Sequence, residues 1–168
     1  MAAGTSLKEG AGLIVGFEGF KDFAANYVAN QLKCRGITLS LPEAPHQEIT
    51  ATALARNLEK ESFRRAVGRK IKKELQGETS VGFPALMGLQ NSIQVKKELE
   101  EIIGANAFEI PILPPSIPGM RIFNRFKEWL IQKGATFLMG HSISKANLKG
   151  KRSEEVYVHK PPISDSYS

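Results

Sequence analysis

Short apolar segments alternate with helical patterns four times along this sequence, and that alternation limits the folds open to it. Each apolar segment is followed by a stretch in which apolar residues recur three or four positions apart, the spacing of an amphipathic helix. Repeated strand–helix units build a parallel sheet with helices packed on it. We therefore predict an α/β fold, a mainly parallel sheet with flanking helices made of four β-α units. The predicted strands are Leu13–Phe17, Ile37–Leu41, Ser80–Met87 and Phe108–Ile112.

The alternation ends near Gly134, and only strand patterns follow. Thr136–Met139 predicts a fifth strand. Ile143–Leu148 and Glu155–His159 predict two antiparallel strands joined through a turn near Gly150, that is, a C-terminal β-hairpin. The predicted organisation is a flexible lead-in over residues 1–10, an α/β domain over 11–134, β-strands over 135–160 and a polar tail over 161–168.

A proline-rich segment leads from the fourth predicted strand to the next helix. Phe108–Arg121 reads FEIPILPPSIPGMR, with Pro111, Pro114, Pro115 and Pro118. Proline fixes φ and lacks an N–H, so this segment is neither a central strand nor a helix interior. It is a stiff, extended loop that serves either to bind a ligand or as a rigid strand-to-helix connection.

The helix after this loop is predicted to start with Pro118 at its first position and Ser116 or Ile117 as its cap. Gly119 lets a ligand approach the backbone closely. Arg121 falls in the first turn, where the helix dipole disfavours a cation, so its charge indicates a role beyond helix stability. The residues predicted to face the core are Ile122, Phe126, Trp129 and Leu130.

The chain is basic, with a formal net charge of +6, and much of the excess lies between Arg56 and Lys73. Such a segment is a solvated helix face, a contact for anionic membrane lipid or a contact for nucleic acid, in falling order of preference. Phe63 is its only aromatic residue and lies on the apolar stripe, so no base-stacking platform is present. A single cysteine, Cys34, excludes an internal disulfide, and three scattered histidines give no metal-ligand spacing.

Ligands of open α/β sheets bind beyond the carboxyl ends of the strands. The loop Gly16–Asp22 contains Gly16-x-x-Gly19, which is not the G-x-G-x-x-G of a dinucleotide-binding loop. Phosphate-binding G-x-x-x-x-G-K-[ST], metalloprotease H-E-x-x-H and hydrolase G-x-S-x-G motifs are also absent from the sequence. Asp22 and Glu109 are candidate acids or bases, but a helix cap for Asp22 and a surface carboxylate for Glu109 are the favoured interpretations.

Three runs occur together in a characteristic order: VGFEGFKDF (Val15–Phe23), VGFPALMGL (Val81–Leu89) and FEIPILPPSIPGMRIF (Phe108–Phe123). With the piece GATFLMGH (Gly134–His141), they resemble the B subunit of anaerobic glycerol-3-phosphate dehydrogenase. The resemblance implies an FAD-dependent flavoprotein that works with a catalytic A subunit and an iron–sulfur, membrane-anchoring C subunit. Together these proteins oxidise sn-glycerol 3-phosphate to dihydroxyacetone phosphate and pass electrons to quinone.

The resemblance covers the middle region of that family. Its N-terminal G-x-G-x-x-G loop for FAD and its closing glycine-rich segment have no counterpart here. Residues 11–134 therefore correspond to an inserted cap or substrate-side domain, and residues 135–160 to strands leading back to an FAD domain. We expect the chain alone to be inactive and to lack most of an FAD site.

The resemblance also suggests site residues. The flavin-facing loop would contain Pro114, Pro115 and Pro118. The phosphate of a small phosphorylated substrate needs cationic or N–H donors. The candidate substrate-binding residues are Ser116, Gly119, Arg121 and Arg125.

Three function classes remain open from the sequence. The first is part of a flavoprotein dehydrogenase, cytoplasmic or peripheral to the inner face of the cell membrane through its partner proteins. The second is a non-catalytic interaction domain that docks on flavoprotein or electron-transfer partners. The third is a basic surface-binding module, which only the segment Arg56–Lys73 favours.

Overall fold

A computed structural model describes residues 10–41 and 48–159. The chain divides between Asn124 and Arg125 into two compact units. The predicted lead-in up to residue 9, residues 42–47 and the predicted tail from residue 160 lie outside the described residues.

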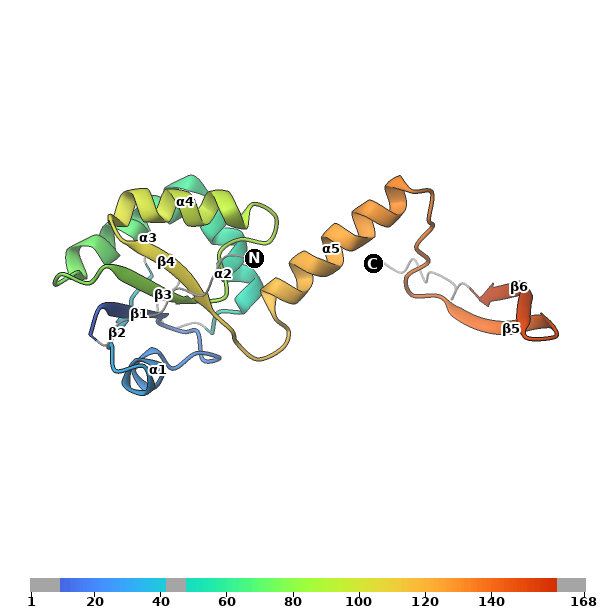
Figure 1. The fold of residues 1–168 in the computed structure, drawn as a ribbon, viewed down its shortest axis with the longest axis horizontal. Coiled ribbons are helices and arrows are strands. Elements are labelled where there is room, and N and C mark those ends of the chain that lie inside the picture. The colour runs from blue at the N-terminus through green and yellow to red at the C-terminus, as the bar shows by residue number, and fades with distance from the viewer. Residues whose placement is uncertain (1–9, 42–47, 160–168) are drawn as a thin grey trace, which may run out of the picture. The chain divides into compact units, whose positions relative to one another are not determined.

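The first unit is built on a four-stranded sheet, as the sequence predicts (Figure 1). Its strands are β1 (Gly12–Phe17), β2 (Arg35–Leu39), β3 (Ser80–Pro84) and β4 (Asn106–Ile110). They lie in the order β2-β1-β3-β4, and every pair is parallel. All six residues of β1 are buried, as expected of a central strand covered on both faces.

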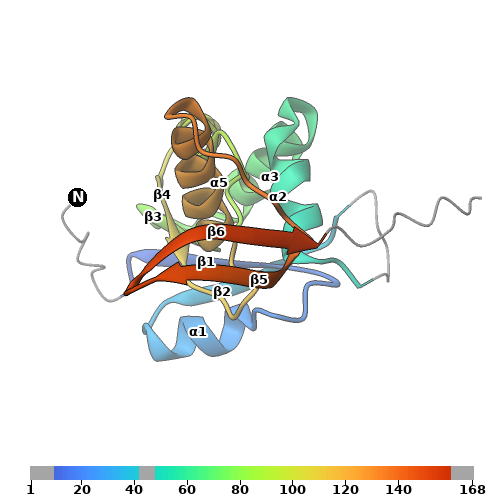
Figure 2. The ribbon, with the colours of Figure 1, turned by 90° about the vertical axis from the view of Figure 1, so that its right-hand side faces the viewer.

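Helices cover both faces of this sheet. Helix α1 (Ala25–Gln31) lies on the face opposite to α2 (Ala51–Glu59), α3 (Glu61–Glu74) and α4 (Ser92–Ile103), as Figures 1 and 2 show. Two glycines let α1 pack close to the strands: a Cβ on Gly16 would lie 2.9 Å from the Ala25 Cβ, and one on Gly36 would lie 2.9 Å from the Ala29 Cβ. The predicted α/β architecture is confirmed.

The predicted helix cap at Asp22 is wrong. Helix α1 begins at Ala25, after Ala24, which has no side chain able to accept a hydrogen bond. The reason is that Phe20 and Phe23 are buried in the loop before the helix, not on a helical stripe. Helix α2 does have a side-chain cap, since the Thr50 hydroxyl accepts a hydrogen bond from the Ala53 N–H.

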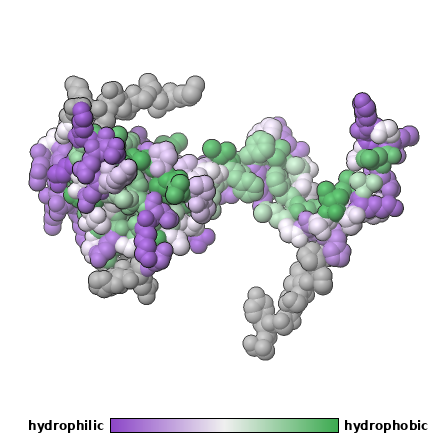
Figure 3. Space-filling model, turned by 90° about the horizontal axis from the view of Figure 1, so that it is seen from below, coloured by the Kyte–Doolittle hydropathy of each residue, from purple (hydrophilic) through white to green (hydrophobic). Residues whose placement is uncertain are grey.

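Helix α5 (Ile117–Gln132) differs from its predicted orientation. Ile122, Phe126 and Trp129, predicted to face the core, are 71%, 59% and 51% exposed, and Leu130 is half-buried. Ile117 alone among the helix residues is buried. Figure 3 shows apolar surface gathered over this helix. Apolar residues do recur along α5 with the period of a helix, but no other part of the described residues covers the apolar stripe that they form.

The second unit contains the predicted β-hairpin. Strands β5 (Ser142–Lys149) and β6 (Arg152–His159) are antiparallel, and Gly150 takes a left-handed conformation in the turn between them. The predicted fifth strand at Thr136–Met139 is wrong, because those residues form no strand. Phe137 instead lies beneath the Lys127 ammonium, and the Met139 sulfur contacts the same ammonium, so this segment folds back on α5.

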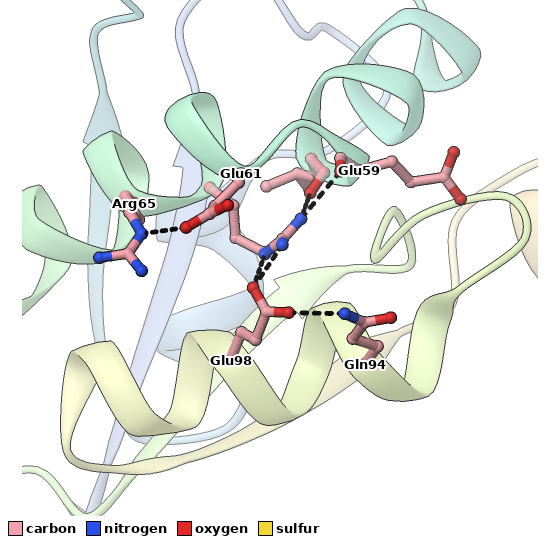
Figure 4. Close-up of polar contacts among 7 residues, drawn as sticks. Glu59, Glu61, Arg65, Gln94 and Glu98 are labelled. Carbon is pink, nitrogen blue, oxygen red and sulfur yellow. Dashed lines mark hydrogen bonds and ion pairs between the residues drawn. The ribbon is translucent and has the colours of Figure 1, made fainter.

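A buried guanidinium joins three helices of the first unit (Figure 4). Arg64 of α3 is only 5% exposed and donates to the carbonyls of Leu58 and Glu59 at the end of α2. Its remaining partner is the Glu98 carboxylate of α4, 2.8 Å from Nε. One residue of the basic segment is therefore a structural residue of the interior, whereas the other cations of that segment lie at least partly exposed on the helix surfaces.

None of the helices in the described residues has both the length and the apolar character needed to cross a bilayer.

Glu98 makes the stability of this unit sensitive to acid. Hydrogen bonds from Arg64 and Gln94 hold the pKa of Glu98 below its ordinary value. A carboxyl group whose pKa is lower in the folded state adds stability above its unfolded pKa and loses that contribution as the pH falls through its folded pKa. We expect Glu98→Gln to lower the free energy of unfolding near neutral pH. Measured by urea denaturation between about pH 7 and about pH 3, the free energy of unfolding of this variant should fall less with decreasing pH than that of the wild type.

The control is Glu101→Gln on the same helix, whose exposed carboxylate lies 3.9 Å from Lys97. It should leave both the stability and its pH dependence nearly unchanged. Equal acid limbs in the wild type and Glu98→Gln would show that the Arg64–Glu98 contact does not stabilise the folded state.

Candidate functional site

The carboxyl edge of the sheet contains a topological switch point between the neighbouring strands β1 and β3. After β1 the chain enters α1 on one face, and after β3 it enters α4 on the other (Figure 1). Since β1 and β3 are neighbours, their two following loops diverge at this edge. In open α/β sheets such a switch point is where ligands bind. The loops at 18–24 and 85–91 are therefore the first place to look for a site.

Apolar side chains occupy this part of the fold. Phe17 and Phe20 from the first loop region are 3% and 4% exposed, and Leu86 and Met87 from the second are 0% and 1% exposed. All four belong to the hydrophobic core. The switch point is therefore packed with side chains over the described residues.

Two carboxylates accept hydrogen bonds from the backbone of the β3–α4 loop, and the first is Glu59. One Glu59 oxygen accepts from the N–H groups of Leu89, Gln90 and Asn91 at 2.9, 2.6 and 3.2 Å. These N–H groups lead into α4, where the helix dipole favours a negative charge. Gly88 takes a left-handed conformation with φ +80°, and a Cβ there would lie 3.1 Å from Glu59. The Glu59 side chain thus holds the backbone N–H groups that lead into α4, which an external anion could otherwise use.

Glu109, at the end of β4, holds the same loop from its other side. One of its oxygens accepts from the Met87 N–H at 2.6 Å. Its carboxylate also receives a bidentate contact from Arg121, with N–O distances of 2.7 and 2.8 Å. Arg121 Nε donates to the Gly88 carbonyl at 2.7 Å. We name this set, Glu109, Arg121 and the backbone of Met87 and Gly88, the carboxyl-edge clasp.

The clasp corrects the favoured sequence interpretation of Glu109 as a surface carboxylate. The Glu109 and Arg121 side chains are only 24% and 16% exposed. Charge-assisted, bidentate contacts of this kind are the strong ones. Sequence reasoning missed the pair because Glu109 and Arg121 are twelve positions apart. The periodicity of one helix or one strand does not indicate contacts at that separation. A cation in the first turns of a helix was the one signal available.

The other candidate substrate residues lie close by but have separate partners. The Ser116 hydroxyl caps α5 by accepting from the Gly119 N–H at 3.1 Å. Arg125 is exposed on α5, with the Glu128 carboxylate 3.9 Å away. Pro114 and Pro115 are exposed and Pro118 is half-buried. The structure therefore brings Ser116 and Gly119 together, places Arg121 in the clasp, and leaves their predicted contact with substrate as a prediction.

A hollow of about 420 Å³ lies at the opposite, amino edge of the sheet. There Arg35 donates to Glu78 at 2.7 Å. Burial opposes ionisation, but this bond and one from the Gln76 N–H outweigh it and lower the pKa of Glu78. Among the described residues no group of histidine, cysteine, aspartate or glutamate is placed to hold a metal ion. The residues lining the hollow are Glu78, Thr79, Glu100, Gly104, Ala105 and Asn106.

Comparison with known proteins gives a consistent result. The family model described as "FAD binding domain" matches residues 2–146. The B subunit of anaerobic glycerol-3-phosphate dehydrogenase from Pectobacterium atrosepticum is 31% identical over 157 residues, which is 88% of this chain and 36% of that protein. A probable B subunit of the same enzyme from Halobacterium salinarum is 28% identical over 188 residues, covering 99% of this chain and 44% of that protein. The search of solved structures gives no significant match.

These relatives confirm the resemblance seen in the sequence motifs. The chain spans less than half of their length, at 36% and 44%.

The described residues do not fit the pyrophosphate of FAD. A dinucleotide site needs free N–H groups at a helix N-terminus and glycines that allow close approach. Gly16 is used for contact with α1, and the Glu59 carboxylate already binds the N–H groups of Leu89, Gln90 and Asn91 just before α4. The Thr50 and Ser116 hydroxyls cap α2 and α5. None of these groups among the described residues is therefore free to hold the pyrophosphate.

The clasp should contribute measurably to stability. Arg121→Ala removes three hydrogen bonds and leaves a half-buried Glu109 carboxylate without its counter-ion. We expect a loss of about 1–3 kcal/mol in the free energy of unfolding, measured by urea denaturation. Arg125→Ala on the same helix is the control, because its side chain is exposed, and it should change stability by less than about 0.5 kcal/mol. Similar losses in both variants would contradict the structural role of the clasp.

Glu59 should be equally important for the β3–α4 loop. Glu59→Ala removes the acceptor of three N–H groups, and we expect a loss of about 1–3 kcal/mol with faster amide exchange at Leu89, Gln90 and Asn91. Glu59→Gln should lose less, since its amide oxygen still accepts. The control is Glu61→Ala, which removes an exposed carboxylate paired with Arg65. Unchanged exchange in Glu59→Ala would disprove the capping role.

Proposed function

Because the chain belongs to the FAD binding domain family, we propose that it is part of an FAD-dependent oxidoreductase, of the type of the B subunit of anaerobic glycerol-3-phosphate dehydrogenase. The observation that carries the proposal is the match to relatives of that name over most of the chain. The overall reaction oxidises the secondary alcohol of sn-glycerol 3-phosphate to the ketone of dihydroxyacetone phosphate. The substrate loses two electrons and two protons, and quinone finally accepts the electrons.

The assembly belongs to the same proposal. The relatives carry the name of a B subunit, and that name supports the presence of further subunits. We propose a catalytic A subunit and an iron–sulfur, membrane-anchoring C subunit, with this protein in the cytoplasm or held at the inner face of the membrane through them. Residues 11–134 would then be the cap or substrate-side domain of the complete protein, and residues 135–160 would lead to its FAD domain.

The substrate contacts of this proposal are centred on the start of α5. Pro114, Pro115 and Pro118 would form a rigid loop facing the flavin, and Ser116, Gly119, Arg121 and Arg125 would hold the substrate phosphate. Arg121 would contribute through the two guanidinium N–H groups that its bonds to Glu109 and Gly88 leave over. Arg125 is the most available of these residues, because its contact with Glu128 is long and both side chains are exposed.

A second candidate function is a non-catalytic interaction domain that docks on flavoprotein or electron-transfer partners. The exposed apolar residues of α5 and of the β5–β6 hairpin favour it. So does the misfit between the described residues and the FAD pyrophosphate.

The proposed activity is testable in a chimera. This chain would replace the matching region of the Pectobacterium atrosepticum relative, expressed with the other subunits of that enzyme. We expect oxidation of sn-glycerol 3-phosphate coupled to quinone reduction. Arg125→Ala should raise KM for this substrate by about tenfold, the loss of one charge-assisted phosphate contact, with little change in stability.

Glu128→Ala in the same chimera is the control, since it removes the partner of Arg125 but no cation. It should leave KM unchanged. A chimera that is folded and contains flavin but oxidises no glycerol 3-phosphate would refute the proposed substrate. An unchanged KM in Arg125→Ala would refute the role of that residue alone.

A further inference from the structure

Helix α3 carries a row of positive charge on its solvent side. Four exposed cations lie on one side of the helix, because the last three follow the first by four, seven and eight positions. We name them the α3 basic face: Arg65, Arg69, Lys72 and Lys73. The other side of the helix is buried in the core. The helix is therefore held by its apolar side and presents the basic face outward.

The charge of the basic face is largely uncompensated. Arg65 has an acidic partner in Glu61, whose carboxylate lies 2.7 Å from the Arg65 Nε (Figure 4). Arg69, Lys72 and Lys73 make no ion pair or hydrogen bond within the part of the chain that the structure describes. Like charges three and four positions apart destabilise a helix. The dipole at the end of α3 favours Lys72 and Lys73 but does not reach Arg65 and Arg69, so helix stability does not account for the whole face.

The neighbouring helix α4 has a different charge pattern. It lies beside α3 on the same face of the sheet (Figure 1). Its lysines have carboxylates one helical turn away, Lys96 with Glu100 at 3.6 Å and Lys97 with Glu101 at 3.9 Å. This is the pattern of a helix face whose charges are balanced within the protein. Within this pair of helices, the unbalanced positive charge is confined to α3.

The residue types of the face discriminate between anionic partners. Nucleic acid is commonly bound through aromatic stacking and through amide side chains that read bases. Helix α3 contains no asparagine or glutamine, and its one aromatic residue, Phe63, is 4% exposed. The tight contacts of a protein interface are centred on apolar or aromatic anchors, and the basic face has none. An anionic lipid surface attracts such a face by charge alone.

We propose that the α3 basic face contacts the phosphate-bearing headgroups of an anionic membrane surface. Its charges stand on long, flexible side chains, which can follow mobile headgroups without a fixed geometry. The choice of a membrane rests in part on the proposed function, because the quinone that accepts the electrons resides in the bilayer. A few cations bind such a surface weakly and reversibly. The contact therefore orients the protein at the membrane and adds to its attachment through partner subunits.

The test is co-sedimentation of the full chain with vesicles made of equal parts phosphatidylglycerol and phosphatidylcholine. Binding should be measurable at low ionic strength and should fall steeply as salt is added, since salt screens exposed charges. Vesicles of phosphatidylcholine alone should not bind the chain. The assay needs neither flavin nor glycerol 3-phosphate.

A triple variant identifies the face. Arg69→Gln with Lys72→Gln and Lys73→Gln removes the three cations that have no partner among the described residues. Each cation near an anionic surface contributes about a factor of five to binding, so the partition coefficient should fall by about a hundredfold. Circular dichroism and the melting temperature check that the variant is folded.

The control changes the net charge by the same amount elsewhere. Lys133→Gln with Lys149→Gln and Lys151→Gln removes three exposed cations of the second unit. It should change the partition coefficient by less than about twofold, because the removed charges do not belong to the basic face.

Four outcomes would overturn the inference. The first two are no binding of the wild-type chain to the anionic vesicles at low salt, and equal losses in the two triple variants. The third is release of the chain by millimolar inorganic phosphate at constant ionic strength, which would show a discrete phosphate site. The fourth is tighter binding to duplex DNA with the same dependence on Arg69, Lys72 and Lys73, which would assign nucleic acid as the partner.

Failure of the proposed function gives a different result. A chimera that oxidises no glycerol 3-phosphate contradicts the proposed substrate and leaves vesicle binding unaffected. A chimera that is active with a soluble quinone, combined with a chain that does not bind anionic vesicles, contradicts the role of the basic face alone.

Discussion

Glu59 and Glu109 together fix the loop that follows β3, and the carboxyl edge of the sheet depends on them. Four backbone N–H groups of this loop donate to these two carboxylates. Arg121 closes the arrangement by binding Glu109 and the Gly88 carbonyl. The loop, the end of α2, the end of β4 and the start of α5 are thereby joined through charge-assisted hydrogen bonds, which are stronger than neutral ones.

This arrangement determines which ligands the edge can accept. Parallel α/β sheets commonly use such a loop and the following helix N-terminus for phosphate. Here the Glu59 carboxylate already binds the N–H groups of Leu89, Gln90 and Asn91, so an external anion at these groups would have to displace Glu59 and leave its charge without donors. The contacts of Arg121 with Glu109 and the Gly88 carbonyl instead hold the start of α5 to the β3–α4 loop and the end of β4. Any substrate contact would come from the residues proposed at the start of α5, of which Arg125 is the most exposed.

The fold could be predicted from the sequence to a large extent, because buried parallel strands leave short apolar runs and their helices leave a 3.6-residue period. The four β-α units and the hairpin followed from these patterns. Local capping was less predictable: Thr50 caps its helix, but Asp22 does not, since burial of Phe20 and Phe23 decides where the chain turns. Glu109 and Arg121 are 12 positions apart, and Glu59 is about 30 positions from the N–H groups that it binds. The periodicity of local segments does not indicate contacts at such separations.

The orientation of α5 shows a different limit. The stripe of Ile122, Phe126 and Trp129 is apolar as predicted, and the error lay in assuming that the core of this unit would cover it. An apolar stripe at helical spacing specifies that one side of a helix needs an apolar neighbour, but not which polypeptide provides it. In the first unit α4 buries the side chains of Val95, Leu99 and Ile103 in the core. Helix α5 has an equally regular stripe and buries only Ile117. Two helices with the same periodicity therefore differ in burial, and the difference comes from what lies opposite each of them.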